Sequence, residues 1–344
     1  MELKIKGKRF TQFSSFNLTL AFDAVASAFS IQLYFDPKNP EHRSLLRPGS
    51  YTICTIEHLG DVLLTGYIIG CQLKNEAEKT LAQINGYSLP GLLEDCQFPT
   101  ESYPVQFDGL TLTEIALKMK EPFTDFGLQI DGWVQEDMDK PYKTTDIKIT
   151  QTVKEYLGQL ASQRNIVLSH SEGGDLLFTR ALVENQLPQY TFASGMPGVT
   201  FALQFNGQAM HSRITVIKEA DVDGGNACQN NVINPYVSIS KPAVIEQTSG
   251  DDVDTVLAAR MALSQELRSI KLTVTIDKWD PIKGELILPN TIISCTVPEL
   301  FIYNPTKFFI RAIDYIGDSQ SMTAVLHCTV PEAYSNTTVT NIFL

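Results

Sequence analysis

The sequence predicts a mainly β fold with an α+β part: two similar small antiparallel β-barrels, a small α+β domain between them, and a helix-containing insertion in the second barrel. Three observations support this: apolar residues alternate with period two near the N-terminus, the period becomes helical mid-chain, and one strand plan occurs twice. The expected divisions are a first barrel domain at 1–96, an α+β domain at 97–188, a second barrel domain at 189–218 and 285–335, the insertion at 219–284 and a tail at 336–344.

The repeated strand plan lies at residues 48–68 and again at 289–313. In each copy a turn pair opens a strand rich in β-branched residues, and a second apolar strand returns. A third strand follows in both copies, and the alignment places Cys54 opposite Cys295. The identity between the copies is loose, so chance similarity is the alternative to two related barrels.

The first barrel is expected from strands that alternate apolar and polar residues. These strands lie at 1–6, 16–22, 29–35, 51–57, 62–70 and 80–86. Alternation of this kind buries one face of each strand. Closure into a barrel would remove the exposed sheet edges.

The middle segment is expected to contain two capped helices and a hairpin. Thr111 and Thr152 each begin a T-x-x-E capping box, and apolar residues then recur at helical spacing until about residues 119 and 161. Apolar runs on both sides of Glu172-Gly173-Gly174 predict a hairpin.

The second barrel begins with a strand expected at 199–205, which we pair with residues 213–218. The stretch 221–235 is rich in Gly and Asn and predicts a surface excursion. A helix follows, capped by Asp254 or Thr255, and residues 272–276 alternate as a strand.

Composition describes a folded, acidic protein. Hydrophobic residues make up 43% and charged residues 19% of the chain, and the net charge is 27 − 39 = −12. This charge argues against nucleic acid or an anionic membrane as a binding partner. No basic-then-apolar leader opens the sequence and no apolar run is long enough to span a membrane, so we expect folding in the cytoplasm where the chain is made.

No catalytic, cofactor or metal site is predicted. The phosphate-loop, dinucleotide, nucleophile-elbow and zincin motifs do not occur, and the five histidines are isolated in sequence. The acidic clusters at 136–139 and 251–254 are explained by solvated loops and helix starts, and Asp221-Val222-Asp223-Gly224-Gly225 is only half of a calcium loop. We therefore expect no enzyme activity.

The cysteines are expected to be reduced and structural. They stand at 54, 71, 96, 228, 295 and 328, without a Cys-x-x-Cys pair, and most lie in apolar strand patterns.

Two apolar segments are candidate assembly surfaces. Phe301 and Tyr303 lie in the extra loop between the matched strands of the second copy. The tail ends in Ile342-Phe343-Leu344 and could add a strand or anchor to a neighbouring subunit, with a frayed terminus as the alternative.

Four passages carry a resemblance to a known family. In order, they are Leu64-Thr65-Gly66-Tyr67-Ile68 with Ile84-Asn85-Gly86-Tyr87-Ser88 and Leu92-Leu93-Glu94-Asp95-Cys96; the helix at 112–119 ending in Glu121-Pro122-Phe123; the segment 152–180; and Trp279-Asp280 with Gly284-Glu285-Leu286-Ile287-Leu288-Pro289-Asn290 and Val330-Pro331-Glu332-Ala333-Tyr334. Over nearly its whole length, the chain resembles the baseplate hub proteins of contractile-tailed phages, especially the Mu-like tail hub family, which is related to the T-even phage baseplate hub. It departs from the family in lacking an arginine around Gly86-Tyr87-Ser88 and in having Leu288 where tryptophan is frequent.

The resemblance implies a structural virion protein in the tail baseplate. It implies a homotrimer whose six barrels form a pseudo-sixfold ring that joins a threefold central spike to a sixfold tail tube or tube initiator, with baseplate wedge proteins as further candidate neighbours. DNA would pass through the ring without specific binding, and neither a membrane nor a cofactor is implied. A net-negative channel would reduce adhesion of the passing phosphates.

Three alternatives stay open at this point. One is the hub of a tailocin-like contractile injection machine. The second, from another functional class, is a carbohydrate-binding or glycan-cleaving tail protein. The third is a multi-domain β-protein that binds a small ligand.

Overall fold

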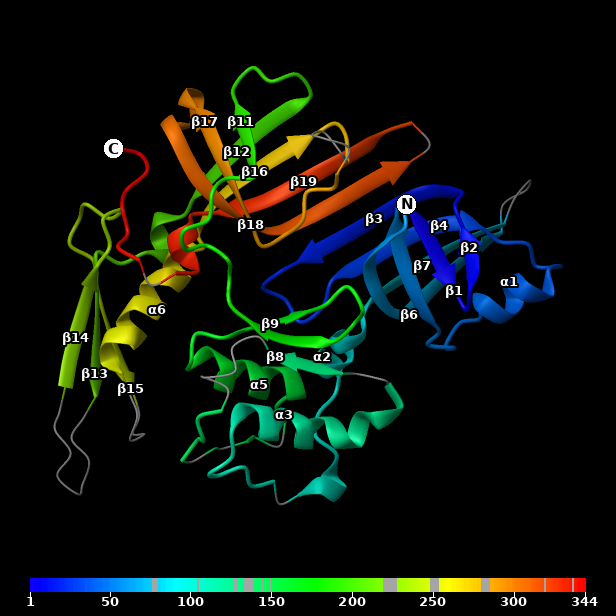
Figure 1. Cartoon of the computed structure of the whole chain (residues 1–344), viewed down its shortest axis with the longest axis horizontal. Helices are drawn as coiled ribbons and strands as arrows, with labels where there is room; N and C mark the ends of the chain where they lie inside the picture. Colours follow the sequence, from blue (N-terminus) through cyan, green and yellow to red (C-terminus); the bar gives the residue numbers. More distant parts are fainter. Residues whose placement is uncertain are drawn as a thin grey trace. The chain divides into compact units, whose positions relative to one another are not determined.

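The computed structural model describes residues 1–75, 80–103, 105–126, 129–132, 139–143, 145, 147–148, 150–218, 228–247, 254–279, 285–318, 320–335 and 337–344. The fold is mainly β, as predicted, with mainly antiparallel sheets and short helices (Figure 1). The chain divides into two compact units. Unit 1 comprises Met1–Thr179, Asp277–Trp279 and Ala312–Val325, and unit 2 comprises Arg180–Ile276, Asp280–Arg311 and Leu326–Leu344.

The main sheet of unit 1 has the order β2-β1-β5-β6-β7-β4-β3, with the C-terminal part of β18 antiparallel to β3. Every strand predicted for the first barrel is present. The elements are β1 (Glu2–Ile5), β2 (Lys8–Phe10), β3 (Phe13–Ala21), β4 (Ala28–Tyr34), α1 (Pro40–Leu45), β5 (Ile53–His58), β6 (Asp61–Asn75) and β7 (Thr80–Ser88). The alternating apolar side chains, such as Leu18, Ile31 and Ile84, are fully buried, which confirms the period-two prediction.

The α+β part of unit 1 contains both predicted capped helices. Its elements are η1 (Leu89–Gly91), α2 (Leu92–Asp95), η2 (Thr100–Ser102), α3 (Leu112–Lys120), η3 (Glu121–Phe126), β8 (Ile130–Gly132), α5 (Val153–Ser162), β9 (Val167–His170) and β10 (Leu176–Thr179). Thr111 and Thr152 close complete capping boxes with Glu114 and Glu155. The strands form a three-stranded sheet of order β8-β10-β9, which contains the predicted hairpin.

Trp279 belongs to unit 1 although its neighbours in sequence belong to unit 2. Its Nε1–H donates to the carbonyls of Ile316 at 2.8 Å and Thr323 at 3.2 Å. Its ring contacts Phe16, with 5.6 Å between ring centroids. A Cβ at Gly317 would lie 2.5 Å from the tryptophan ring, so only glycine fits against it. Trp279 therefore holds the end of the β18–β19 hairpin by packing and by hydrogen bonds.

Unit 2 is built around strands in the order β12-β16-β19-β18-β17-β11, to which β18 and β19 contribute their parts in this unit. The elements are β11 (Tyr190–Ala193), β12 (Val199–Phe205), η4 (Gly207–Ala209), β13 (Arg213–Lys218), β14 (Cys228–Ile233), β15 (Pro242–Gln247), α6 (Thr255–Leu267), β16 (Ile270–Ile276), β17 (Thr291–Val297), η5 (Pro298–Leu300), β18 (Ile302–Asp318), β19 (Met322–Thr329) and η6 (Pro331–Ala333). Asp254, rather than Thr255, is the N-cap of α6: its carboxylate accepts from the N–H groups of Val256 and Leu257.

The strand order repeats between the units. The sequence β1-β5-β6-β7-β4-β3 in unit 1 has the counterpart β11-β17-β18-β19-β16-β12 in unit 2. Cys54 on β5 lies between Ile5 and Gly66, and Cys295 on β17 lies between Phe192 and Thr306. The two cysteines thus occupy corresponding strands. One difference is that β1 runs antiparallel to β5, whereas β11 runs parallel to β17.

The expected pairing of residues 213–218 with the strand at 199–205 is wrong. β13 is the centre of a separate three-stranded sheet, β14-β13-β15, while β12 pairs with β16 and Phe205 lies opposite Ile270. The buried residues of β13, Ile214 and Val216, lie in a strand that contacts α6. The sheet and helix inserted between β12 and β16 therefore span residues 206–269, whereas we expected an insertion at 219–284.

Several expectations fall wholly or partly outside the described residues. These are the carboxylates at 136–138 and 251–253, the half calcium loop at 221–225, and most of the Gly- and Asn-rich stretch before residue 228. Among the helices of the described residues, none is long and apolar enough to cross a membrane.

Candidate functional site

The turn that leads from η5 into β18 presents an exposed aromatic pair, with Phe301 at the end of η5 and Tyr303 at the start of β18. Phe301 and Tyr303 are 63% and 62% exposed, while Ile302 between them is fully buried. Strand alternation therefore directs both aromatic rings outward, and their centroids are 6.4 Å apart with nearly perpendicular planes. We name this pair the aromatic loop.

The backbone of the aromatic loop is fixed by local bonds. Phe301 has a left-handed φ of 62° and ends the short helix η5, and its N–H donates to the carbonyl of Pro298 at 3.1 Å. The Ser194 hydroxyl donates to the Glu299 carboxylate at 2.9 Å. Hydrogen bonds from the backbone of Glu299 and from Ser194 lower the pKa of Glu299. Exposed rings on a held turn can bind a partner with little loss of conformational entropy.

The C-terminal tail is held against its own unit. Phe343 packs edge-to-face on Phe205 and Tyr236, with centroids 6.0 and 5.9 Å away. The Tyr236 hydroxyl donates to the Thr340 carbonyl at 3.0 Å, and the N–H of Ile342 donates to that hydroxyl at 3.4 Å. Burial raises the pKa of Tyr236.

Of the predicted tail residues, only Leu344, at 98% exposure, is left almost fully accessible. Ile342 and Phe343 are partly buried by their own chain. The aromatic loop is therefore the better presented of the two candidate surfaces.

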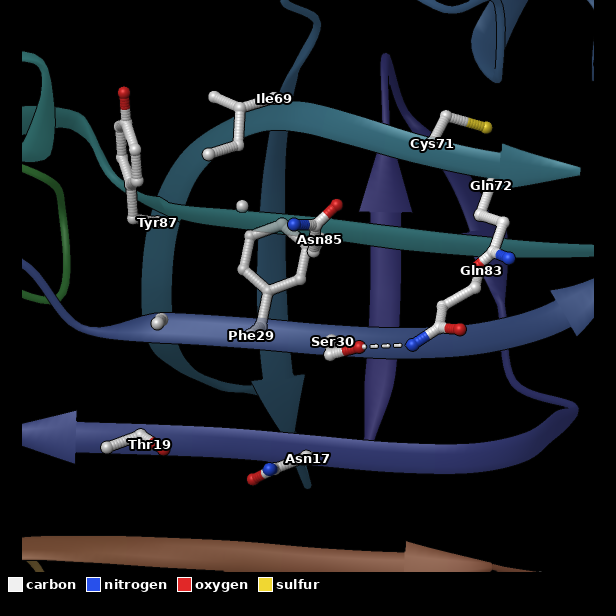
Figure 2. A pocket seen from close by; sticks show the side chains of 12 residues that line it. Asn17, Thr19, Phe29, Ser30, Ile69, Cys71, Gln72, Gln83, Asn85 and Tyr87 are labelled. Carbon is white, nitrogen blue, oxygen red and sulfur yellow. Dashed lines mark hydrogen bonds between the residues drawn. The ribbon is translucent and has the colours of Figure 1, made fainter. Parts of the chain in front are cut away.

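A pocket of about 570 Å³ opens on the main sheet of unit 1. Its polar lining residues come from four neighbouring strands, β3, β4, β7 and β6, as Figure 2 shows. The twelve lining residues are Asn17, Thr19, Ala28, Phe29, Ser30, Ile69, Cys71, Gln72, Gln83, Asn85, Gly86 and Tyr87. None of them carries a charge. Sequence reasoning missed this pocket because the adjacency of the four strands cannot be read from alternation.

A serine and a histidine far apart in the sequence meet within unit 1. His170 Nε2 lies 2.6 Å from the Ser27 hydroxyl, and His170 Nδ1 lies 3.2 Å from the carbonyl of Ser171. Burial lowers the pKa of His170. Ser27 is fully buried, and its hydroxyl also accepts from the N–H of Ala21 at 3.0 Å. A nucleophile must reach its substrate, so this pair is a structural link between the β9–β10 hairpin and the β3–β4 connection rather than a hydrolytic centre.

The remaining candidates for chemistry are also accounted for by local structure. His211 Nδ1 lies 2.6 Å from the Glu266 carboxylate, and the N–H of His211 bonds to the same side chain. No group of three or more potential metal ligands occurs among the described residues. Cys54, Cys71, Cys96, Cys295 and Cys328 are free thiols, and burial raises the pKa of all five.

Comparison with known proteins agrees with the predicted resemblance. No protein-family model matches the chain. The baseplate hub protein gp44 of Escherichia phage Mu is 22% identical over 332 residues, covering 92% of this chain and 84% of that protein.

Solved structures show the same fold over nearly the whole chain. The 43 kDa tail protein of prophage MuSo2 from Shewanella oneidensis has a TM-score of 0.78 at 22% identity and covers 97% of this chain and 99% of its own. A tail protein from Neisseria meningitidis has a TM-score of 0.75 at 17% identity, with 97% and 98% coverage.

The similarity extends to secretion systems. The c3393 protein of E. coli, a type VI secretion component described as structurally similar to the T4 tail proteins gp27 and gp5, has a TM-score of 0.55 at 11% identity and covers 97% of this chain and 78% of its own. The predicted resemblance is therefore confirmed: this chain is similar in sequence to the baseplate hub protein of a Mu phage and has the fold of Mu-like prophage tail proteins.

Proposed function

We propose that this protein is the structural baseplate hub of a phage contractile tail. Three copies form a ring that joins a threefold central spike to a sixfold tail tube or tube initiator, and DNA passes through the centre. The protein assembles in the host cytoplasm, resides in the virion tail, and has no catalytic role. Baseplate wedge proteins are further candidate neighbours.

The observation that carries this proposal is the repeated strand order of the two units. Three copies of a chain with two similar units present six similar surfaces, so one gene product can match both threefold and sixfold neighbours. Cys54 and Cys295 lie on the corresponding strands β5 and β17, which supports the repeat. The relatives described above, a baseplate hub and two tail proteins, point to the same class of assembly.

The aromatic loop is our candidate for the contact between copies. A ring needs a heterologous interface, in which two different patches meet. Phe301 and Tyr303 would insert into the neighbouring copy, since aromatic residues are enriched in the buried centres of interfaces. Leu344 and the tail are secondary candidates. A stable contact of this kind should bury more than about 1,000 Å².

The net charge of −12 fits a conduit for DNA. Cationic contacts hold phosphate, and an acidic protein offers few of them. We therefore expect a channel of net negative potential that DNA passes without adhering.

Native mass spectrometry and sedimentation velocity test the assembly. The wild-type chain, alone or with the spike protein, should give masses that are multiples of three copies. The double variant Phe301→Ser with Tyr303→Ser should dissociate at concentrations where the wild type is trimeric, with an unchanged unfolding midpoint. The matched control is Leu59→Ser, which removes an apolar side chain that is 81% exposed on another turn. This variant should remain trimeric. Baseplate particles that contain the chain in any number other than a multiple of three would refute the hub proposal.

A further inference from the structure

The pocket on the main sheet of unit 1 is built by the register of four strands. One row across the sheet runs Asn17, Ser30, Asn85 and Gly70. In this row the small Ser30 leaves space next to the longer amide side chains, and the space over Gly70 is taken by the Asn85 amide. A Cβ at Gly70 would overlap the Asn85 amide, so the glycine is needed for the amide to lie where it does. The hollow therefore follows from the placement of small residues rather than from loose packing.

The neighbouring rows complete the walls. On one side lie Thr19, Ala28 and Tyr87, and on the other lie Gln83 and Gln72. The pairing of β6 with β7 shifts between Ile68 and Gly70, a bulge that adds Ile69 to the lining. The Tyr87 hydroxyl donates to Asp95 at 2.5 Å, which fixes the ring at the edge of the pocket.

The polar groups of the pocket are available to a ligand. Gln83 donates to the Ser30 hydroxyl at 3.1 Å, the one bond drawn in Figure 2. Within the described residues, no hydrogen bond is found for the side-chain amides of Asn17, Gln72 or Asn85. Each such amide offers two donors and one acceptor group.

The chemistry of the lining selects the class of ligand. An ion bound here would lose water without gaining a counter-charge, because none of the lining residues is charged. A protein partner would require an apolar centre, since the buried centres of interfaces are apolar, whereas the central row of this pocket, Asn17, Ser30 and Asn85, is polar. Sugar hydroxyls both donate and accept hydrogen bonds, as the amides do, and the carbon faces of a sugar ring can pack on Ile69 and the Tyr87 ring.

We propose that this amide-lined pocket binds an uncharged oligosaccharide. Asn17, Gln72 and Asn85 supply hydrogen bonds to hydroxyl or acetamido groups. The small side chain of Ser30 leaves room for a sugar ring above the sheet. The pocket volume lies within the usual range for small-ligand sites, which is about 300–1,000 Å³. The proposal depends on unit 1 alone and is independent of the hub function.

The test measures sugar binding by the full-length chain in the oligomeric state that it adopts. The probes are N-acetylglucosamine and maltose oligomers of four units, compared with a sulfated oligosaccharide and inorganic phosphate, by calorimetry and by ligand-observed NMR. We expect one uncharged oligomer to bind with a Kd of about 1 mM or tighter and the charged probes not to compete. The two uncharged oligomers distinguish an acetamido-bearing from a purely hydroxylated ligand.

Variants then locate the site. Asn17→Ala with Gln72→Ala should weaken binding about tenfold, as expected for the loss of two hydrogen bonds, and Ser30→Leu should abolish binding by filling the hollow. Gln204→Ala removes an exposed strand amide of β12 in unit 2 and should leave binding unchanged. Circular dichroism shows whether each variant is folded. Absence of binding by all uncharged oligomers at about 10 mM, or binding that Ser30→Leu does not alter in a folded variant, would overturn the proposal, and neither result would bear on trimer formation.

Discussion

Replacing Trp279 by alanine should strongly destabilise unit 1. The ring is 7% exposed, and burial of an aromatic side chain removes roughly 150–250 Å² from water, or about 4–6 kcal/mol at 25 cal/mol per Å². Measured losses for Trp→Ala in cores are about 3–5 kcal/mol. In a unit of this size each kcal/mol lowers the Tm by about 2–4 °C, so Trp279→Ala should lower the Tm by about 6–20 °C.

Trp279→Phe separates packing from hydrogen bonding. It keeps most of the ring but removes the Nε1–H that donates to Ile316 and Thr323. We expect a loss of about 1–3 kcal/mol, because two partly buried carbonyls lose a donor. Urea titration followed by circular dichroism measures all variants under the same conditions.

A double-mutant cycle with Gly317 tests the proposed contact directly. Gly317→Ala should cost about 1–3 kcal/mol in the wild type, where the new methyl group meets the tryptophan ring. The same change should cost close to nothing in Trp279→Ala, where the ring is absent. If Gly317→Ala has the same effect in both backgrounds, the two residues are not coupled and the explanation of this glycine is wrong.

Three further predictions concern other groups. Burial lowers the pKa of His170 in the folded protein, so on acidification the unfolded chain takes up a proton before the folded protein does. The free energy of unfolding should be at its full value above about pH 6.5 and should decrease as the pH falls below it. It should decrease less in His170→Gln, and an equal dependence of unfolding free energy on pH in both proteins would contradict this. Burial raises the pKa of Cys54 and of Cys295 to about 12, so neither thiol should react with iodoacetamide at pH 8 until the protein unfolds, which mass spectrometry of the labelled peptides can check. Tyr236→Phe removes the hydroxyl that bonds the tail, and carboxypeptidase should release Leu344 up to about tenfold faster, whereas an unchanged rate would mean that the tail is held by ring packing alone.

Local sequence patterns predicted which helices and strands form better than they predicted how the strands pair. The capping boxes at Thr111 and Thr152 depend on residues three positions apart, and both are present. The strand at 213–218 was correctly identified but assigned to the wrong sheet, because alternation shows that one face is buried and does not show what buries it.

The candidate site was predictable to a smaller extent. We expected Phe301 and Tyr303 in a loop, but Tyr303 belongs to β18, and the exposure of both rings follows from alternation around the buried Ile302. The Ser27–His170 contact joins residues 143 positions apart, and a pairing of that range has no signal in one sequence. Packing of Phe343 on Phe205 is likewise tertiary, and neither of the two predictions for the terminus, a frayed end or an anchor for a neighbouring subunit, included it.

Because Phe205 pairs directly with Ile270, the segment between them could be replaced by a short turn or by another module. Paired residues of antiparallel strands have Cα atoms only about 5 Å apart, so a two-residue turn could connect β12 to β16. Closing a longer connection costs little, about 0.6 kcal/mol for each doubling of its length. Relatives could therefore gain, lose or exchange the β13–β15 sheet and α6 while keeping the pairing of β12 with β16. The bond from Thr329 of β19 to the Leu267 carbonyl and the packing of α6 on η6 would then need a replacement.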